Sequence, residues 1–359
     1  MICHYGDHLH IRIWGASHDP QIGVDITGIA ANLPVDLDAL QHFLDRRAPG
    51  KNAWTTNRKE SDIPHFLGGI YDGHTTGETI SAVINNTNHN SKDYDNIRHI
   101  PRPGHADFTA WHKYGPEFDM SGGGPFSGRM TAPLCIAGGL CKQWLQQMGI
   151  AIGAHIFSVC TVSDEPFDPI APNLKAVQTD FPVLDSTIGE QMQQAIATAR
   201  QNGDSLGGVI ECAVLGLPIG IGGPLFDGLE GKIAHAIYGI PGVKGLEFGL
   251  GFASTKLHGS QTNDSFIMED GRIRTATNHS GGILGGISNG MPLMLRVAIK
   301  PTPSIAIPQQ SVNMDQGEEV TLQIQGRHDP CIVPRAVPVV ESAVAIAIYD
   351  MILNNQPNK

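Results

Sequence analysis

Glycine and proline are spread along the whole of this chain, and that spread restricts its fold more than any other sequence feature. The 359 residues include 43 glycines and 24 prolines, and no long linker gathers them. Because both residue types end helices and form turns, their density argues against a mostly helical protein. No low-complexity tract, charge block or fixed-period repeat divides the sequence. We therefore expect one integrated domain that covers residues 1–359.

Between the turns, the pattern of apolar residues separates helices from strands. Apolar residues at helical spacing predict helices over 36–47, 132–148, 187–201, 226–238 and 337–353. Alternating or β-branched runs predict strands over 10–13, 24–29, 79–84, 209–214, 293–299 and 320–324. The elements are interleaved without the regular rhythm of a doubly wound sheet. This order predicts an α+β fold, with helices packed on largely antiparallel sheets.

Charge and cysteine usage limit the partners and the compartment. A formal charge of −11 makes the chain a poor binder of nucleic-acid backbone or of an anionic membrane surface. The 6 cysteines show no spacing typical of disulfide frameworks or zinc sites, which favours free thiols in a reducing compartment. The N-terminus lacks an apolar signal region, and no apolar run reaches the roughly 18 residues of a membrane span. We expect a cytoplasmic protein.

The basic residues lie mainly in polar turns flanked by glycine. The segment 102–109 places an arginine, a histidine and a carboxylate within six residues, and the glycine run 121–124 follows it. Arginine binds phosphate and carboxylate with two donors, and glycine turns expose backbone N–H groups to anions. These turns predict an active-site loop that holds an anion and moves a proton. An anionic metabolite fits this acidic chain if the basic residues converge in one pocket.

Each turn taken alone also has a purely structural interpretation. A loop histidine is often solvated or caps a helix, and the glycine run could be only a flexible turn. Arg46 and Arg47 could complement the dipole of the helix that they end. The glycine runs fit neither a dinucleotide fingerprint nor a P-loop. No histidine spacing matches a metal site, so no metal is expected.

Taken together and in order, these segments resemble the chorismate synthase family over nearly the full length. The matching blocks are 15–18, 22–23, 46–50, 58–60, 75–77, 86–94, 102–107, 204–208, 240–245, 278–290, 300–302 and 327–331. The resemblance, to a divergent bacterial-type member, implies a lyase that converts 5-enolpyruvylshikimate-3-phosphate to chorismate by 1,4-elimination of phosphate and a ring proton. It implies a need for reduced FMN without net redox change. It also implies a β-α-β sandwich, with helices between two antiparallel sheets, in a homotetramer.

The resemblance also assigns roles to individual residues. The implied catalytic residues are His18, which would assist the leaving phosphate, His105, which would hold charge on the reduced flavin, and Asp329, which would help remove the ring proton. The implied substrate-binding cations are Arg47, Arg129 and Arg327, with Arg46 and Arg335 as nearby candidates. The implied FMN contacts are Pro125, Phe126, Ser127, Gly285, Lys300, Pro301, Thr302, Pro303, Ser304 and Arg327.

The chain departs from the family pattern around the glycine run and at the first turn. Where many members have Gly-Glu-Ser-His-Gly, residues 15–19 read Gly-Ala-Ser-His-Asp. Many members carry two arginines and a glutamate around the glycine run, and this chain lacks them at Ser121 and within 125–131. Pro125 also removes a backbone N–H donor. We expect weaker affinity for phosphate or FMN as a result.

Other interpretations of the chain stay open. The first alternative is a non-catalytic or altered relative that binds FMN or a phosphorylated ligand, and the second is a scaffold protein. The chain has no nicotinamide fingerprint, so we expect an external flavin reductant, while intrinsic NADP-linked reduction stays open. Residues 160–182 form an excursion to which the sequence assigns no role.

Overall fold

A computed structural model describes residues 2–50, 54–55, 60–86, 99–324 and 329–354. Its first sheet consists of five antiparallel strands from the N-terminal quarter of the chain. In spatial order these are β1 (Ile2–Tyr5), β2 (His10–Trp14), β3 (Gln21–Thr27), β7 (Ile80–Asn85) and β4 (His65–Gly68). Isoleucines and valines of β3 and β7 are fully buried, so one face of this sheet belongs to the core.

The second sheet also has five antiparallel strands, taken from the rest of the chain. In spatial order they are β11 (Val243–Phe248), β16 (Leu293–Ile299), β10 (Gly208–Leu215), β8 (Ala151–Val159) and β9 (Val162–Ser163). The sequence did not predict β8 or β11, because Gly153 and His155 in β8 and the Gly245 of β11 interrupt the apolar pattern.

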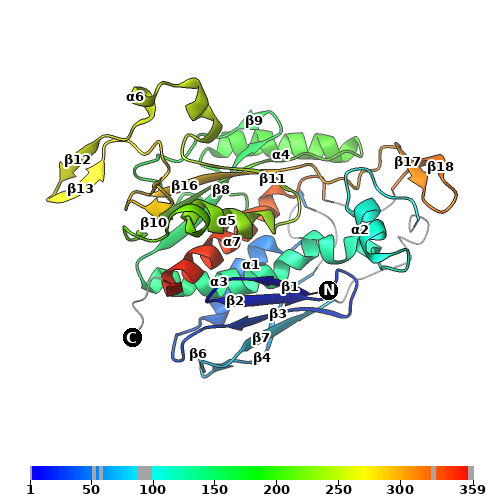
Figure 1. Ribbon diagram of the computed structural model, residues 1–359. Coiled ribbons are helices and arrows are strands. Elements are labelled where there is room, and N and C mark those ends of the chain that lie inside the picture. Colours follow the sequence, from blue (N-terminus) through cyan, green and yellow to red (C-terminus); the bar gives the residue numbers. More distant parts are fainter. Residues whose placement is uncertain (1, 51–53, 56–59, 87–98, 325–328, 355–359) are drawn as a thin grey trace.

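Helices fill the space between the two sheets, as Figure 1 shows. The middle layer contains α1 (Leu37–Arg47), α3 (Thr131–Gln147) and α7 (Val333–Asn354), with α5 (Leu229–Tyr238) packed beside α7. The outlying α4 (Ser186–Gln201) packs against β8 and β9. The predicted sandwich of helices between two antiparallel sheets is therefore confirmed, and all five predicted helices are present with shifted ends.

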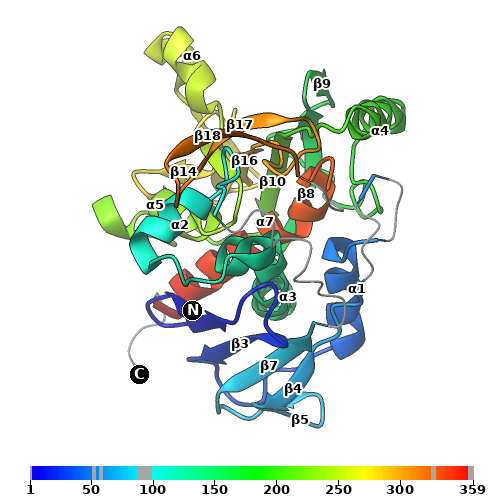
Figure 2. The same ribbon diagram turned by 90° about the vertical axis from the view of Figure 1, so that its right-hand side faces the viewer.

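The remaining elements are short, and Figures 1 and 2 show one of them, α6 (Gly259–Thr262), projecting from the sandwich. They are α2 (Asp107–Tyr114), α6 (Gly259–Thr262), the 3₁₀ segments η2 (Ser121–Phe126), η3 (Gly128–Met130), η4 (Leu225–Asp227) and η5 (Gly251–Lys256), and the strand pairs β5 (Ile70–Tyr71) with β6 (His74–Thr75), β12 (Phe266–Glu269) with β13 (Arg272–Thr275), β14 (Ile283–Leu284) with β15 (Ile287–Ser288), and β17 (Gln309–Asn313) with β18 (Glu318–Leu322).

Helix α7 is joined to both sheets by its two carboxylates. Glu341 and Asp350 are separated by about two and a half turns, so they point to opposite sides of the helix. Glu341 binds Arg46 of α1, Lys142 of α3 and the backbone N–H of Ala154 in β8. Asp350 accepts three backbone N–H groups of residues 7–9, at 2.7–3.0 Å, in the turn between β1 and β2. The last helix therefore fixes the spacing of the whole sandwich.

Apart from these carboxylates, α7 is strongly apolar. It is the one helix in the described ranges that is long and apolar enough to cross a membrane, and 89% of its apolar window is buried inside the fold. Arg335, Glu341 and Asp350 interrupt its apolar run. Such burial is typical of a core helix, and α7 packs against α1, α3 and α5 as well as against β8 and β10.

Glu341 is charged although it is buried. Burial opposes its ionisation, but Arg46 and Lys142 outweigh that effect and lower its pKa from the usual 4.5 to about 2. The lowered pKa means that ionised Glu341 stabilises the folded protein at any pH above its unfolded-state pKa of about 4.5. This contribution is lost as the pH falls toward the folded-state pKa of about 2.

Replacement of Glu341 by glutamine should therefore destabilise the fold. We expect the free energy of unfolding at pH 7 to fall by about 3 kcal/mol, because two cations lose their buried partner. Urea unfolding should show a constant difference from the wild type between pH 7 and 5, and a shrinking one below about pH 4.5. The matched control is E190Q, which removes an exposed carboxylate from α4. A loss as small as that of the control would contradict the assigned role.

Candidate active site

A turn of three glycines lies against two histidines that are distant in sequence. Gly122, Gly123 and Gly124 in η2 have φ values of 61°, 95° and 52°, which side chains rarely adopt. A Cβ on Gly122 would overlap the ring of His18, and one on Gly123 would lie 3.2 Å from Nε2 of His105. The absence of side chains is therefore what allows this turn to contact both imidazoles.

His18 is held at its Nδ1 atom. The hydroxyl of Ser17 lies 3.0 Å from this nitrogen and donates to the carbonyl oxygen of Ser121 at 3.0 Å. A hydroxyl has one proton to donate, so the Ser17 oxygen accepts from the Nδ1–H group of His18. The other nitrogen, Nε2, is then the atom that gains and loses a proton.

His105 is held at Nδ1 by a carboxylate that is itself fixed. Asp107 accepts from this nitrogen at 2.7 Å and receives two bonds of 2.7 Å from the guanidinium of Arg102. This chain of contacts directs Nε2 of His105 toward the glycine turn. The segment 102–109, which the sequence singled out, thus forms a rigid unit at the start of α2.

Burial, aided by two nearby cations, lowers the pKa of His105 and favours its neutral imidazole. Burial lowers the pKa of His105 below its usual 6.5, Arg102 and Lys300 lower it further, and Asp107 only partly offsets these effects. Arg102 and His105 in turn hold the pKa of Asp107 well below its usual range, despite its burial. At neutral pH the unit therefore contains an ionised Asp107 and an uncharged His105.

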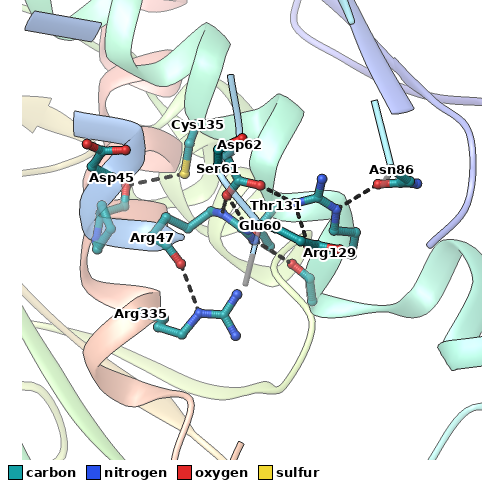
Figure 3. A network of polar contacts seen from close by, with 12 residues as sticks. Asp45, Arg47, Glu60, Ser61, Asp62, Asn86, Arg129, Thr131, Cys135 and Arg335 are labelled. Carbon is teal, nitrogen blue, oxygen red and sulfur yellow. Dashed lines mark hydrogen bonds and ion pairs between the residues drawn. The ribbon is translucent and has the colours of Figure 1, made fainter. Parts of the chain in front are cut away.

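Two buried arginines share one carboxylate beside the turn (Figure 3). Asp62 accepts from Nε and Nη2 of Arg47 at 2.9 and 2.5 Å and is also bound by Arg129. Arg129 further binds Glu60 at 2.9 Å and Asn86 at 3.0 Å. Burial raises the pKa of Asp62, but Arg47 and Arg129 lower it by more, so the carboxylate is charged. Both guanidinium groups are neutralised by acids in this structure.

A cavity of about 680 Å³ opens in front of these groups, within the size range of small-molecule sites. Residues from both sheets and from the middle layer line it. The lining includes these residues implied by the family resemblance: His105, Pro125, Phe126, Ser127, Arg129, Lys300, Pro301, Thr302, Pro303, Ser304, Asp329 and Arg335. The charged side chains of the lining are Arg102, Arg129, Lys244, Lys300 and Arg335 against Glu60 and Asp329. A chain with a net negative charge thus presents a mainly cationic cavity.

Other implied residues are placed differently. His18 contacts Gly122, which lines the cavity, and Arg47 donates to the carbonyl of Gly128, which also lines it. Gly285 lies in the turn between β14 and β15, away from the lining. Arg327 lies outside the described residues.

The resemblance suggested Arg46 as a nearby candidate for substrate binding, but the structure shows a different contact for this residue. Its guanidinium forms two bonds to Glu341, of 2.8 and 3.0 Å, and it does not line the cavity. Successive residues of a helix point about 100° apart, so Arg46 faces α7 while Arg47 faces Asp62. Arg335 instead lines the cavity, binds Asp329 and donates to the backbone carbonyl of Arg47 at 2.8 Å.

Sequence reasoning assigned no role to the segment 238–244, which forms one wall of the cavity. The block 240–245 was noticed, but nothing local in it distinguishes a ligand contact from an ordinary turn. Among the described residues, no group of three or more His, Cys, Asp or Glu side chains could hold a metal ion.

The titration of His105 tests the geometry of the Arg102–Asp107 unit. We expect its imidazole to titrate below pH 6.5 in the wild type, as followed by NMR. D107N should lower this pKa further, because it removes a negative charge and frees the positive charge of Arg102. In a D119N control, the pKa of His105 should be unchanged. A midpoint above 6.5, or an upward shift in D107N, would refute this account of the electrostatics.

Comparisons with known proteins identify the family of this chain. Residues 9–353 match the sequence profile of the family described as chorismate synthase. The chorismate synthases of Lancefieldella parvula and Methanocella arvoryzae are each 44% identical to the chain, cover 98% of it, and are themselves covered over 96% and 94%. A crystal structure of a chorismate synthase superposes with a TM-score of 0.77 at 27% identity, over 98% of this chain and 93% of that one. The chain belongs to the chorismate synthase family.

Proposed function

We propose that this chain is a lyase that eliminates phosphate and a ring proton from 5-enolpyruvylshikimate-3-phosphate to give chorismate, a step in aromatic amino acid biosynthesis. The observation that carries the proposal is the mainly cationic cavity in an acidic chain, with His105 in its wall and His18 against its glycine turn. The substrate bears a phosphate and two carboxylates, which such a cavity attracts.

The described residues fit a flavin mononucleotide as the cofactor. The cavity is large enough, its lining supplies cations and backbone groups, and Oγ1 of Thr302 is buried without a hydrogen-bond partner in the described part of the chain. Residues 125–127 and 300–304 would hold the flavin, with Gly285 and Arg327 as further proposed contacts. When bound in its reduced form, the flavin supplies electron density for C–O cleavage and recovers it afterwards.

His18 is the proposed acid for the leaving phosphate. Its Nδ1 is fixed by Ser17, so Nε2 is the atom that would donate a proton as the C–O bond breaks. Protonation would neutralise the negative charge that develops on the phosphate as it leaves.

His105 and Asp329 are proposed to act beside the flavin. Burial lowers the pKa of His105, and a nearby anion would favour its protonation at Nε2, so that the imidazolium would hold that negative charge. Asp329, paired with Arg335, is proposed to help remove the ring proton.

Arg129, Arg335, Arg47 and Arg327 are the proposed substrate cations. Arg129 and Arg335 line the cavity, and each is bound to an acid. A phosphate or carboxylate of the substrate would compete with Glu60 and Asp329 for these guanidinium groups. Buried Arg47 would act through the same network.

A relative that binds FMN or a phosphorylated ligand without eliminating phosphate is the second candidate. It is favoured by Ser121 and Pro125, which place a hydroxyl and a residue without an N–H donor in the glycine turn.

The proposal of a lyase has three further parts. The enzyme would use an external flavin reductant, form a homotetramer and be located in the cytoplasm.

An anaerobic assay tests the proposal. The protein is mixed with FMN reduced by dithionite and with 5-enolpyruvylshikimate-3-phosphate, and chorismate absorbance and phosphate release are followed. We expect equal release of both over many turnovers. No release with FMN still bound would favour the ligand-binding relative.

The H18A variant tests the proposed acid. We expect the rate to fall about 10²–10⁴-fold, the usual contribution of general acid catalysis, while FMN affinity is unchanged. H42A, which removes an exposed histidine of α1, is the control and should keep wild-type activity. An H18A rate within a few-fold of the control would refute the role of His18.

A further inference from the structure

An irregularity in the second sheet re-aims one lysine at the edge of the cavity. In the pairing of β11 with β16, Val243 lies opposite Ile299 and Gly245 lies opposite Ala298. Lys244 is therefore the extra residue of a β-bulge, and bulges often redirect a side chain beside a functional site. Lys244 lines the cavity.

A second lysine leaves the neighbouring strand at the same edge. Lys300 follows β16 directly, and its backbone N–H donates to the carbonyl of Gly242 at 2.9 Å. Its ammonium group also lines the cavity and donates to the carbonyl of Gly104. The two side chains thus come from adjacent strands into one corner, which we call the lysine corner (Lys244 and Lys300).

The lysine corner differs from the other cations of the lining in its charge balance. The guanidinium groups of Arg102, Arg129 and Arg335 are each bound to a carboxylate. Within the described ranges, neither lysine has a carboxylate at ion-pair distance. Burial lowers the pKa of Lys300, and repulsion from Lys244 adds to this. Two neighbouring positive charges that no acid neutralises favour a ligand that carries two negative charges.

A nearby hydroxyl gives independent support for a ligand. Thr302 lies two residues after Lys300 and lines the same cavity, and its Oγ1 is buried without a hydrogen-bond partner among the residues described. Buried hydroxyls are normally bonded, so this one points to a missing partner.

We propose that Lys244, beside Lys300, is a binding residue for a phosphate monoester dianion. The inference rests on the proposed function, because both proposed ligands, FMN and 5-enolpyruvylshikimate-3-phosphate, carry such a group. A single carboxylate would leave one of the two cations uncompensated. Lys244 already lines the cavity, at the point where the register of β11 and β16 shifts.

Binding measurements on K244Q test this proposal without relying on turnover. The dissociation constants of oxidised FMN and of 5-enolpyruvylshikimate-3-phosphate are measured by calorimetry, beside riboflavin and 5-enolpyruvylshikimate, which lack the phosphate. Loss of a charged hydrogen bond should weaken one of the two phosphorylated ligands about tenfold or more. The matching unphosphorylated compound should bind K244Q and the wild type equally, and inorganic phosphate should compete with the affected ligand.

Two further variants complete the design. K244R keeps the charge and should retain most of the affinity, whereas K256Q removes an exposed lysine of η5 and should change nothing. The ligand that is weakened identifies the source of the phosphate.

The proposal is overturned if K244Q binds both phosphorylated ligands as the wild type does. It is equally overturned if riboflavin weakens as much as FMN, or if the wild type binds neither phosphorylated ligand. Tight binding that depends on Lys244, in a protein without phosphate release, would refute the proposed elimination while supporting the lysine corner.

Discussion

The ionised carboxylate of Glu341 is the interaction on which the arrangement of this molecule depends. It lies in the middle layer and joins α1, α3, α7 and β8 at one point. Buried charges are costly unless they are paired, so these elements can pack only in the arrangement that brings Arg46 and Lys142 to it. That arrangement sets the direction of the next residue, Arg47, and with it the Asp62 network beside the cavity. The geometry of the site therefore follows from a contact outside it.

The two proposed catalytic histidines are each positioned by a glycine turn and by one polar side chain. Gly122 and Gly123 let one turn contact both His18 and His105. Ser17 holds Nδ1 of His18 and Asp107 holds Nδ1 of His105, which leaves Nε2 of each ring for the proposed chemistry. The protonation of Nε2 in both rings can therefore respond to the charge of a ligand in the cavity.

Much of this structure could be predicted from the sequence, because its strongest signals are local. Apolar periodicity located the helices, and the 102–107 motif identified the Arg102–Asp107 unit that surrounds His105. The partner of Arg46 could not be predicted, since Glu341 lies 295 residues further along the chain. The role of Lys244 was hidden for a similar reason: a bulge exists only in the register between two strands. The predicted start of the last helix was residue 337, whereas α7 begins at Val333. Pro334 does not prevent this earlier start, because it lies in the first turn of the helix, where proline is tolerated.

The two carboxylates of α7 also determine when the protein can finish folding during its synthesis. The N-terminal sheet is translated first, but the turn of residues 7–9 finds its acceptor only in Asp350, and β8 finds Glu341 only slightly earlier. Helix α3 already packs on β3 and β7 of the first sheet, but the second sheet lacks the helix that packs on β8 and β10 until α7 has been synthesised. The backbone N–H groups of Leu9 and Ala154 therefore find these acceptors only after a further 341 and 187 residues, respectively, have been synthesised.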